Sequence, residues 1–251
     1  MNRYFIEVAY NGKRYAGFQK QMNANTVQAE VEKVLSAYFK SEFNLTGSSR
    51  TDAGVHAVQN FFHFDTDIAI VEQGADKTMY HLNAMLPWDI VVKSIELKKA
   101  DAHCRFDALS RTYAYRIYAS KNPFLADGAY YFPFSLRLED MNAAATIIKS
   151  HSDFEAFSKR STQVHTFICD IMTSQWNEEN GVLTYDVSAN RFLRGMVKGL
   201  VGTMLQVGRG KIDIGGFTEI ILSKNAARVN FAVPAHGLTL MEVQYQIDSI
   251  K

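Results

Sequence analysis

A short loop of small and polar residues, Gly47–Ala57, lies between two segments that we predict to be strands. The preceding segment is Phe43–Thr46, and the following one, Val58–Phe64, is rich in aromatic and β-branched residues. Gly47 and Gly54 allow backbone conformations that other residues resist, and they let another molecule approach the chain closely. The sequence therefore predicts a glycine-flanked loop fixed between two strands.

The centre of this loop carries a guanidinium, a hydroxyl and a carboxylate at consecutive positions: Arg50, Thr51 and Asp52. In an extended backbone, side chains two residues apart point the same way, so Arg50 and Asp52 can face one target. One interpretation is that Thr51 and Asp52 cap a following turn while Arg50 is solvated. The other is that Asp52 acts on a bound molecule. Chemistry alone favours the cap.

The order of residues 47–57 is Gly-Ser-Ser-Arg-Thr-Asp-Ala-Gly-Val-His-Ala, and it resembles the catalytic loop of the tRNA pseudouridine synthase A family. This motif is long and seldom met elsewhere. In that family the aspartate is the catalytic carboxylate, so the resemblance implies this role for Asp52. It also implies that Arg50 fills the gap left by a displaced base or holds the displaced RNA backbone.

Further segments follow the family pattern with small departures. They are Tyr10–Gly12 with Asn11, Tyr15–Gln19 with Phe18, Thr26–Gln28, Ala102–Ala108 with Cys104, Phe154–Phe157 and Pro234–Leu238. The resemblance reaches from Tyr10 to Tyr245. It implies that Leu238 forms an apolar wall beside the target uracil.

Residues Arg111–Tyr118 alternate as a strand does, and they contain three tyrosines that we expect on one face. A packed aromatic surface is the common meaning of such a face. The family pattern, a basic residue followed by x-Tyr-x-Tyr, implies instead that Tyr113 stacks on the uracil.

An apolar stripe of helical spacing runs through Phe192, Met196, Leu200 and Met204. Between residues 191 and 211 the chain carries five cations and no acid, which predicts a positive patch at one end of this helix. The alternative is a core helix with solvated cations. The resemblance makes Lys198, where the family has Arg, the partner of the catalytic carboxylate, although Lys lacks the bidentate fork of Arg.

Cations in two regions are candidates for phosphate contacts. The segment 13–21 interleaves basic and aromatic residues, as RNA-binding loops do, although a solvated loop is equally consistent with it. The candidates are Arg14, Lys20, Arg191, Arg194, Arg209 and Lys211.

The net charge of the 251-residue chain is only +1, so overall charge does not indicate an RNA partner and any RNA site must come from clustering. The 47% hydrophobic and 21% charged composition is that of a globular protein. There is no secretory h-region and no apolar run long enough to cross a bilayer. With only two cysteines, we expect a cytoplasmic protein without disulfides.

Helices expected at 27–38, 75–86 and 138–149 alternate with strands at 3–10, 89–95, 111–118, 169–176 and 182–189. This mixture predicts an α+β fold. Because no Pro/Gly/Ser-rich linker interrupts the chain, we expect two packed lobes. Residues 1–105 would carry the catalytic loop, and residues 106–251 the tyrosine strand and basic helix. The resemblance implies one continuous, mainly antiparallel sheet with helices on the outside.

Three other kinds of site fit poorly. Gly208–Lys211 lacks the first glycine and the final Ser/Thr of a phosphate loop. The histidines and cysteines show no metal-ligand spacing, so no metal is expected. A glycosidase needs two carboxylates, and the central loop has one. We expect Asp65 and Asp67, at the end of a strand, to be turn residues.

The resemblance implies isomerisation of uridine to pseudouridine in the tRNA anticodon arm, at uridines 38 to 40, by a homodimer without a cofactor. The carboxylate would be held ionised by a neighbouring cation and would attack either the sugar or the base. A non-catalytic RNA-binding protein with this fold and a relative that modifies other RNAs are the alternatives. The presence of both Asp52 and Tyr113 argues against the first of these.

Overall fold

A computed structural model describes residues 1–159 and 166–246, which form two compact units. The first comprises residues 1–109 with the C-terminal strand from Thr239, and the second comprises residues 110–238. The last strand therefore groups with the first unit, whereas the expected division at residues 105 and 106 assigned it to the second lobe. Within the first unit, this strand begins parallel to the strand that starts at His56.

The first unit is built on the strands β1 (Asn2–Tyr10), β3 (His56–Thr66), β4 (Ile90–Lys98) and β9 (Leu238–Tyr245). β1 lies between β3 and β4 and is antiparallel to both. β9 runs parallel to β3 at its beginning, with His56 opposite Thr239. The two-residue β2 (Thr46–Gly47) pairs antiparallel with β3, opposite His63 and Phe62.

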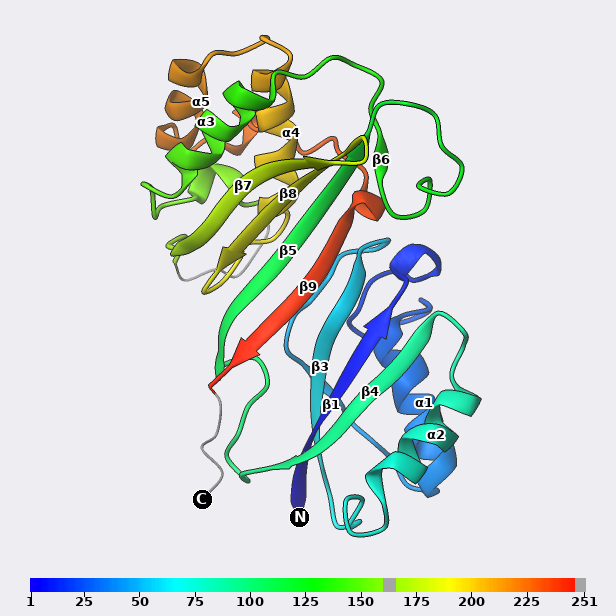
Figure 1. Cartoon of the computed structure of the whole chain (residues 1–251). Helices are drawn as coiled ribbons and strands as arrows, with labels where there is room; N and C mark the ends of the chain where they lie inside the picture. Colours follow the sequence, from blue (N-terminus) through cyan, green and yellow to red (C-terminus); the bar gives the residue numbers. More distant parts are fainter. Residues whose placement is uncertain (160–165, 247–251) are drawn as a thin grey trace. The chain divides into compact units, whose positions relative to one another are not determined.

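Two helices, α1 (Val27–Phe39) and α2 (Ala75–Met85), cover one face of this sheet (Figure 1). The side chain of Thr26 caps α1 as expected, accepting a hydrogen bond from the Ala29 amide at 3.3 Å. The expected apolar face of α1 is buried, and α2 ends before Pro87 because proline cannot continue a helix. A single turn of 3₁₀ helix, η1 (Gly12–Arg14), follows β1.

In the second unit, β8 (Val182–Ala189) lies between β5 (Ala108–Tyr118) and β7 (Ile171–Glu179) and is antiparallel to both. Asn180 and Gly181 join β7 to β8 with positive φ angles of 51° and 74°, the conformation that a two-residue hairpin favours. The short β6 (Tyr130–Tyr131) runs parallel to β5.

Helices gather on one face of the β7–β8 hairpin in this unit (Figure 1). They are α3 (Leu138–Ile148), α4 (Met196–Gly208) and α5 (Ile214–Leu222), with the 3₁₀ turns η2 (Glu155–Phe157) and η3 (Ala226–Arg228). A further 3₁₀ turn, η4 (Ala235–Gly237), ends directly before Leu238. Eleven of the thirteen residues of α4 are buried, so it is the core helix of the unit. Both units are α+β with mainly antiparallel strands, and the expected fold class is confirmed.

Several local predictions were wrong. Phe43–Leu45 is not a strand, and β3 begins at His56, so the loop proper is residues 48–55. Asp65 lies inside β3, where its carboxylate pairs with the guanidinium of Arg3 at 2.6 Å, because Arg3 is its direct cross-strand neighbour. Tyr118 lies an odd number of residues from Tyr113 and so belongs to the opposite face of β5.

Candidate active site

Strand β3 holds the 48–55 loop through the buried side chain of Asn60. Its amide nitrogen donates to the Ser49 carbonyl at 3.0 Å and to the Tyr10 hydroxyl at 3.1 Å. Its carbonyl oxygen accepts from the Ser48 hydroxyl at 2.7 Å, and the Ser48 amide donates to the Phe61 carbonyl at 2.8 Å. One fully buried amide therefore ties the start of the loop to two strands.

The middle of the loop is fixed at Thr51. Its hydroxyl and that of Tyr10 on β1 share a hydrogen bond of 2.8 Å, and its carbonyl accepts from the Phe18 amide at 3.1 Å. Thr51 is buried, so its hydroxyl serves this tertiary contact. The Asp52 carbonyl accepts from the Val55 amide at 3.2 Å, and this closes a turn in which Gly54 has a φ of 79°.

The 12–18 segment packs against the far end of the loop. A Cβ atom on Gly12 would lie 2.0 Å from the Val55 carbonyl oxygen, so only glycine fits there. The Gly12 amide donates to Nδ1 of His56 at 3.1 Å, which fixes the imidazole as an acceptor at that nitrogen. The family segment around Gly12 thus supports the backbone of the loop.

Arg50 and Asp52 are exposed on this fixed backbone, on either side of the buried Thr51. In this unit, a carboxylate and a guanidinium two residues apart are presented to solvent by a loop that Asn60, Tyr10 and Phe18 hold in place. Such an arrangement can present an ionised oxygen nucleophile to a large substrate.

The two candidate cations near the loop, Arg14 and Lys20, are paired with carboxylates. The Arg14 guanidinium makes two hydrogen bonds to Asp89, at 2.6 and 3.1 Å, and lies over the ring of Trp88. Burial raises the pKa of the Asp89 carboxyl. Hydrogen bonds from Arg14 and Tyr15 lower this pKa by more than burial raises it, so the net pKa lies below its ordinary value. Asp89 is therefore ionised and offsets the charge of Arg14.

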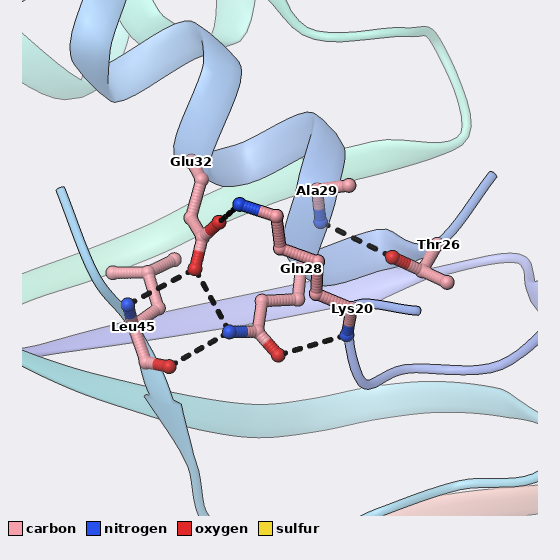
Figure 2. Close-up of polar contacts among 6 residues, drawn as sticks. All are labelled: Lys20, Thr26, Gln28, Ala29, Glu32 and Leu45. Carbon is pink, nitrogen blue, oxygen red and sulfur yellow. Dashed lines mark hydrogen bonds and ion pairs between the residues drawn. The ribbon is translucent and has the colours of Figure 1, made fainter. Parts of the chain in front are cut away.

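Lys20 belongs to a network around the buried carboxylate of Glu32 on α1 (Figure 2). Its ammonium lies 2.8 Å from Glu32, whose other oxygen accepts from the Gln28 side chain at 2.8 Å and from the Leu45 amide at 3.1 Å. The Gln28 amide also donates to the Leu45 carbonyl at 2.8 Å. Lys20 thus neutralises a buried carboxylate that fastens the chain before β2 to α1.

In the second unit, Tyr113 of β5 packs edge-on against Phe192, with ring centroids 5.2 Å apart and an interplanar angle of 88°. Phe192 lies in the segment before α4, which is held by hydrogen bonds from Arg111 to the Asn190 carbonyl and from the Lys159 amide to the Arg194 carbonyl. Tyr113 remains partly exposed. Its ring is oriented by its neighbour and still presents surface to solvent.

The five cations of residues 191–211 are divided between the two ends of helix α4. Helix α4 begins only at Met196, because Gly195 adopts a left-handed conformation with φ 76° at its N-cap. Arg191 and Arg194 precede this 13-residue helix, whereas Arg209 is its C-cap and Lys211 follows it. The two pairs are thus separated by roughly 20 Å of helix. The expected positive patch can thus include Arg191, Arg194 and Lys198 at the N-terminal end of α4, but not Arg209 and Lys211.

Lys198 and Leu238 occupy defined positions in this unit. Lys198 lies in the first turn of α4, which has no acid, so its charge and the helix N-terminus both favour an anion. Leu238 is buried and follows η4. Tyr115 holds that turn, since its hydroxyl donates to the Pro234 carbonyl at 2.8 Å and a Cβ on Gly237 would lie 2.7 Å from its ring.

Residues 1–159 and 166–246 contain no group of three or more His, Cys, Asp or Glu side chains placed to hold a metal ion. No helix in the same part of the chain is long and apolar enough to cross a membrane.

Cys104 is buried. Its thiol donates to the Thr46 carbonyl at 3.1 Å and lies 3.2 Å from Nδ1 of His63.

Sequence reasoning missed the residues that hold the loop, above all Asn60 and Tyr10. A signal existed for Asn60: it is an amide directly before the aromatic run Phe61–Phe64, where a buried polar group must find partners. These partners cannot be read from the residues beside Asn60, since Ser48, Ser49 and Tyr10 reach it through tertiary structure.

A sequence profile described as tRNA pseudouridine synthase matches residues 6–107 and 148–246, most of the chain. The chain belongs to the tRNA pseudouridine synthase family. The resemblance inferred from residues 47–57 is thus confirmed, and the family is one of isomerases. Asp52, Lys198 and Leu238 lie inside the matched segments. Tyr113 lies between them, so its assignment continues to rest on its local tyrosine pattern.

Curated relatives named tRNA pseudouridine synthase A match this chain over nearly their full length. The protein from Azobacteroides pseudotrichonymphae is 40% identical over 98% of this chain and 97% of its own. That from Parabacteroides distasonis is 41% identical over 98% and 96%. A more distant one, from Staphylococcus saprophyticus, is 35% identical over 96% and 90%. The family similarity therefore includes both units.

Proposed function

We propose that this chain isomerises uridine to pseudouridine at positions 38, 39 and 40 in the anticodon stem-loop of tRNA. Family membership and the names of the relatives support the reaction and the tRNA substrate. The observation that carries the proposal is the exposed Asp52 on a loop fixed by buried hydrogen bonds to β1 and β3. A catalytic group needs such support to keep its geometry.

The reaction breaks the N-glycosidic bond of uridine, turns the uracil, and rejoins it to the ribose through C5. The C5 proton is lost and N1 gains one, so no electrons are gained or lost overall and no cofactor is required. Asp52, ionised, is the nucleophile or the group that stabilises the sugar cation. Attack on the sugar and attack on the base both fit an exposed carboxylate.

Uridines within the anticodon stem are stacked, so the target must be flipped out, at a cost of a few kcal/mol. We assign Arg50 to filling the gap that the base leaves or to holding the displaced RNA backbone, because it is exposed and two residues from Asp52. We assign Tyr113 to stacking on the uracil and Leu238 to an apolar wall that excludes water, since hydrolysis would leave an abasic site. These assignments rest on the family pattern.

Lys198 is our candidate for the cation that keeps Asp52 ionised. Its place in the first turn of α4, where an anion is favoured, supports this role, and so does its correspondence to the family's arginine. If Lys198 has this role, Lys198→Arg should retain most of the activity.

The family pattern also leads us to propose that the enzyme works in the cytoplasm as a homodimer. Sedimentation equilibrium of the full chain tests the dimer. A mass twice the 28.3 kDa of the chain is expected, and a monomer at the concentration used for catalysis would contradict it.

Mapping of pseudouridines in tRNA from cells lacking this gene tests the proposed function. Pseudouridine should disappear at positions 38–40 and return when the wild-type gene, but not an Asp52→Asn gene, is restored. Unchanged modification at all three positions would contradict the proposal. Loss at other positions, or in another RNA, would assign the same chemistry to a different substrate.

A further inference from the structure

A hollow of about 220 Å³ opens in the first unit beside the 48–55 loop. Its lining includes Gln28 of α1, Leu45 before β2, Arg50 of the loop, and His103, Arg105 and Phe106 of the turn that follows β4. Arg50 is two residues from Asp52, so their Cα atoms lie at most about 7 Å apart. The hollow therefore begins next to the catalytic carboxylate.

Two residues of the lining, Gln28 and Leu45, belong to the Glu32 network (Figure 2). The Gln28 side chain donates to both Glu32 and the Leu45 carbonyl, while its own oxygen accepts from the Lys20 amide at 3.0 Å. Gln28 and Leu45 are thereby held in place without any ligand. The hollow is preformed on this side, which lowers the entropy lost on binding.

The lining also includes Phe106, which is 73% exposed. The ring of His103 lies against it, with centroids 4.2 Å apart, and contacts the ring of His63 at 4.5 Å. Nδ1 of His103 accepts hydrogen bonds from the amides of Arg105 and Phe106 at 3.2 and 3.4 Å. Phe106 is therefore supported by a fixed imidazole while most of its surface faces water. An exposed aromatic held in this way is a stacking platform.

The charge of the lining is positive. Arg50 and Arg105 supply two guanidinium groups, and no lining residue is acidic. The Arg105 guanidinium lies 5.7 Å from the centroid of the Phe106 ring. Arginine beside an exposed aromatic is the combination that binds an unpaired nucleotide, through its phosphate and its base.

We propose that this hollow binds one unpaired nucleotide of the tRNA, on the strand that carries the target uridine. Its base stacks on Phe106, and its phosphate is bound by Arg105 and Arg50. The inference rests on the proposed function, because the substrate is then RNA and the strand passes Arg50 to reach Asp52. Binding a neighbour of the target outside the stem helps to keep the stem open while the target uridine is flipped out.

The test measures the Kd for an unmodified tRNA transcript that has uridine at position 39. All variants also carry Asp52→Asn, which prevents turnover during the measurement. Phe106→Ala should raise the Kd about tenfold. Phe106→Trp should restore the affinity, whereas Phe106→Leu, apolar but unable to stack, should not. Arg105→Ala should reduce the slope of log K against log salt by about one, and Arg105→Lys should restore it.

Matched controls lie on α2. Tyr80 is 72% exposed, almost as much as Phe106, and Lys77 is an exposed cation, while neither lines the hollow. Tyr80→Ala and Lys77→Ala should leave the Kd within about twofold, which separates stacking and phosphate contact from a general loss of aromatic surface or charge. Unfolding midpoints of all variants should agree, since every substituted side chain is exposed.

Two outcomes separate this inference from the proposed function. If the wild type forms pseudouridine but Phe106→Ala and Arg105→Ala bind tRNA as their parent does, the hollow is not a nucleotide site and the function stands. If the wild type forms no pseudouridine while Phe106→Ala still weakens tRNA binding tenfold and Tyr80→Ala does not, the hollow binds RNA and the proposed reaction is wrong.

Discussion

Asn60 is the single residue on which the position of the catalytic loop depends most. Its amide engages the Ser49 carbonyl, the Ser48 hydroxyl and the Tyr10 hydroxyl in a fully buried setting. Asn60→Ala leaves these groups buried without partners, and each such group costs about 1–3 kcal/mol. We expect a loss of at least about 2 kcal/mol in the free energy of unfolding, measured in urea, and a clear fall in kcat.

The control for this variant is Asn44→Ala, which removes an exposed amide shortly before the loop. It should change both stability and kcat very little. If Asn60→Ala unfolds at the same urea concentration as the wild type and keeps its kcat, Asn60 does not hold the loop.

His63 gives stability a predictable pH dependence. Burial, and then the charges of His103 and Arg3, lower its pKa from 6.5 to about 4, against weaker opposing effects of Asp65 and Asp107. Between pH 6.5 and 4 the unfolded chain binds a proton that the folded chain does not, so stability falls as the pH falls. The contribution is at most about 3 kcal/mol across this window.

Unfolding in urea at a series of pH values checks this. His63→Gln should lose some stability at pH 7 through altered packing but should show a flatter decline between pH 6.5 and 4. Parallel curves for the variant and the wild type would mean that His63 titrates normally in the folded protein.

At the scale of elements, the attachment of α1 to the chain before β2 depends on Glu32 (Figure 2). Glu32→Ala removes the acceptor for Gln28, Lys20 and the Leu45 amide, and should lower the free energy of unfolding by about 3 kcal/mol. Glu30→Ala, two residues earlier on the same helix, should cost less than about 1 kcal/mol. Equal losses in urea unfolding for the two variants would show that the network adds nothing specific.

Elements whose signals are local were predictable from the sequence. Thr26 caps α1 and Pro87 follows the end of α2, because a cap and a proline act within one turn of the helix. The start of α4 was not predictable: the apolar stripe continues back to Phe192, and only the left-handed Gly195 interrupts the helix. The pairing of Arg14 with Asp89 was also missed, since it joins segments 75 residues apart.

At the scale of the whole molecule, a net charge of +1 means that RNA affinity depends on which cations are already paired. If Arg191, Arg194 and Lys211 contact phosphates, replacing each by Ala should reduce the salt slope of tRNA binding by about one. Arg14→Ala and Lys20→Ala should reduce it less, because Asp89 and Glu32 already offset these charges. If Arg14→Ala reduced the salt slope by one unit and Arg191→Ala did not change it, Arg14 and not Arg191 would be the phosphate contact.

The family, the fold class and Asp52 could be proposed from sequence because the 47–57 motif is contiguous. The grouping of β9 with the first unit could not, because its pairing with β3 joins residues that are far apart in the chain, such as His56 and Thr239. The hollow beside Arg50 depends on the same kind of contact, between the start of α1 and the turn at His103–Phe106.

Release of tritium from tRNA labelled at C5 of uracil tests the central claim most directly, because pseudouridine formation must expel that hydrogen. The wild type should release tritium in proportion to the modifiable uridines. Asp52→Asn should release none above background while binding tRNA with nearly unchanged affinity, since phosphate contacts supply most of it. Substantial release by Asp52→Asn, or none by the wild type on any tRNA, would contradict the account.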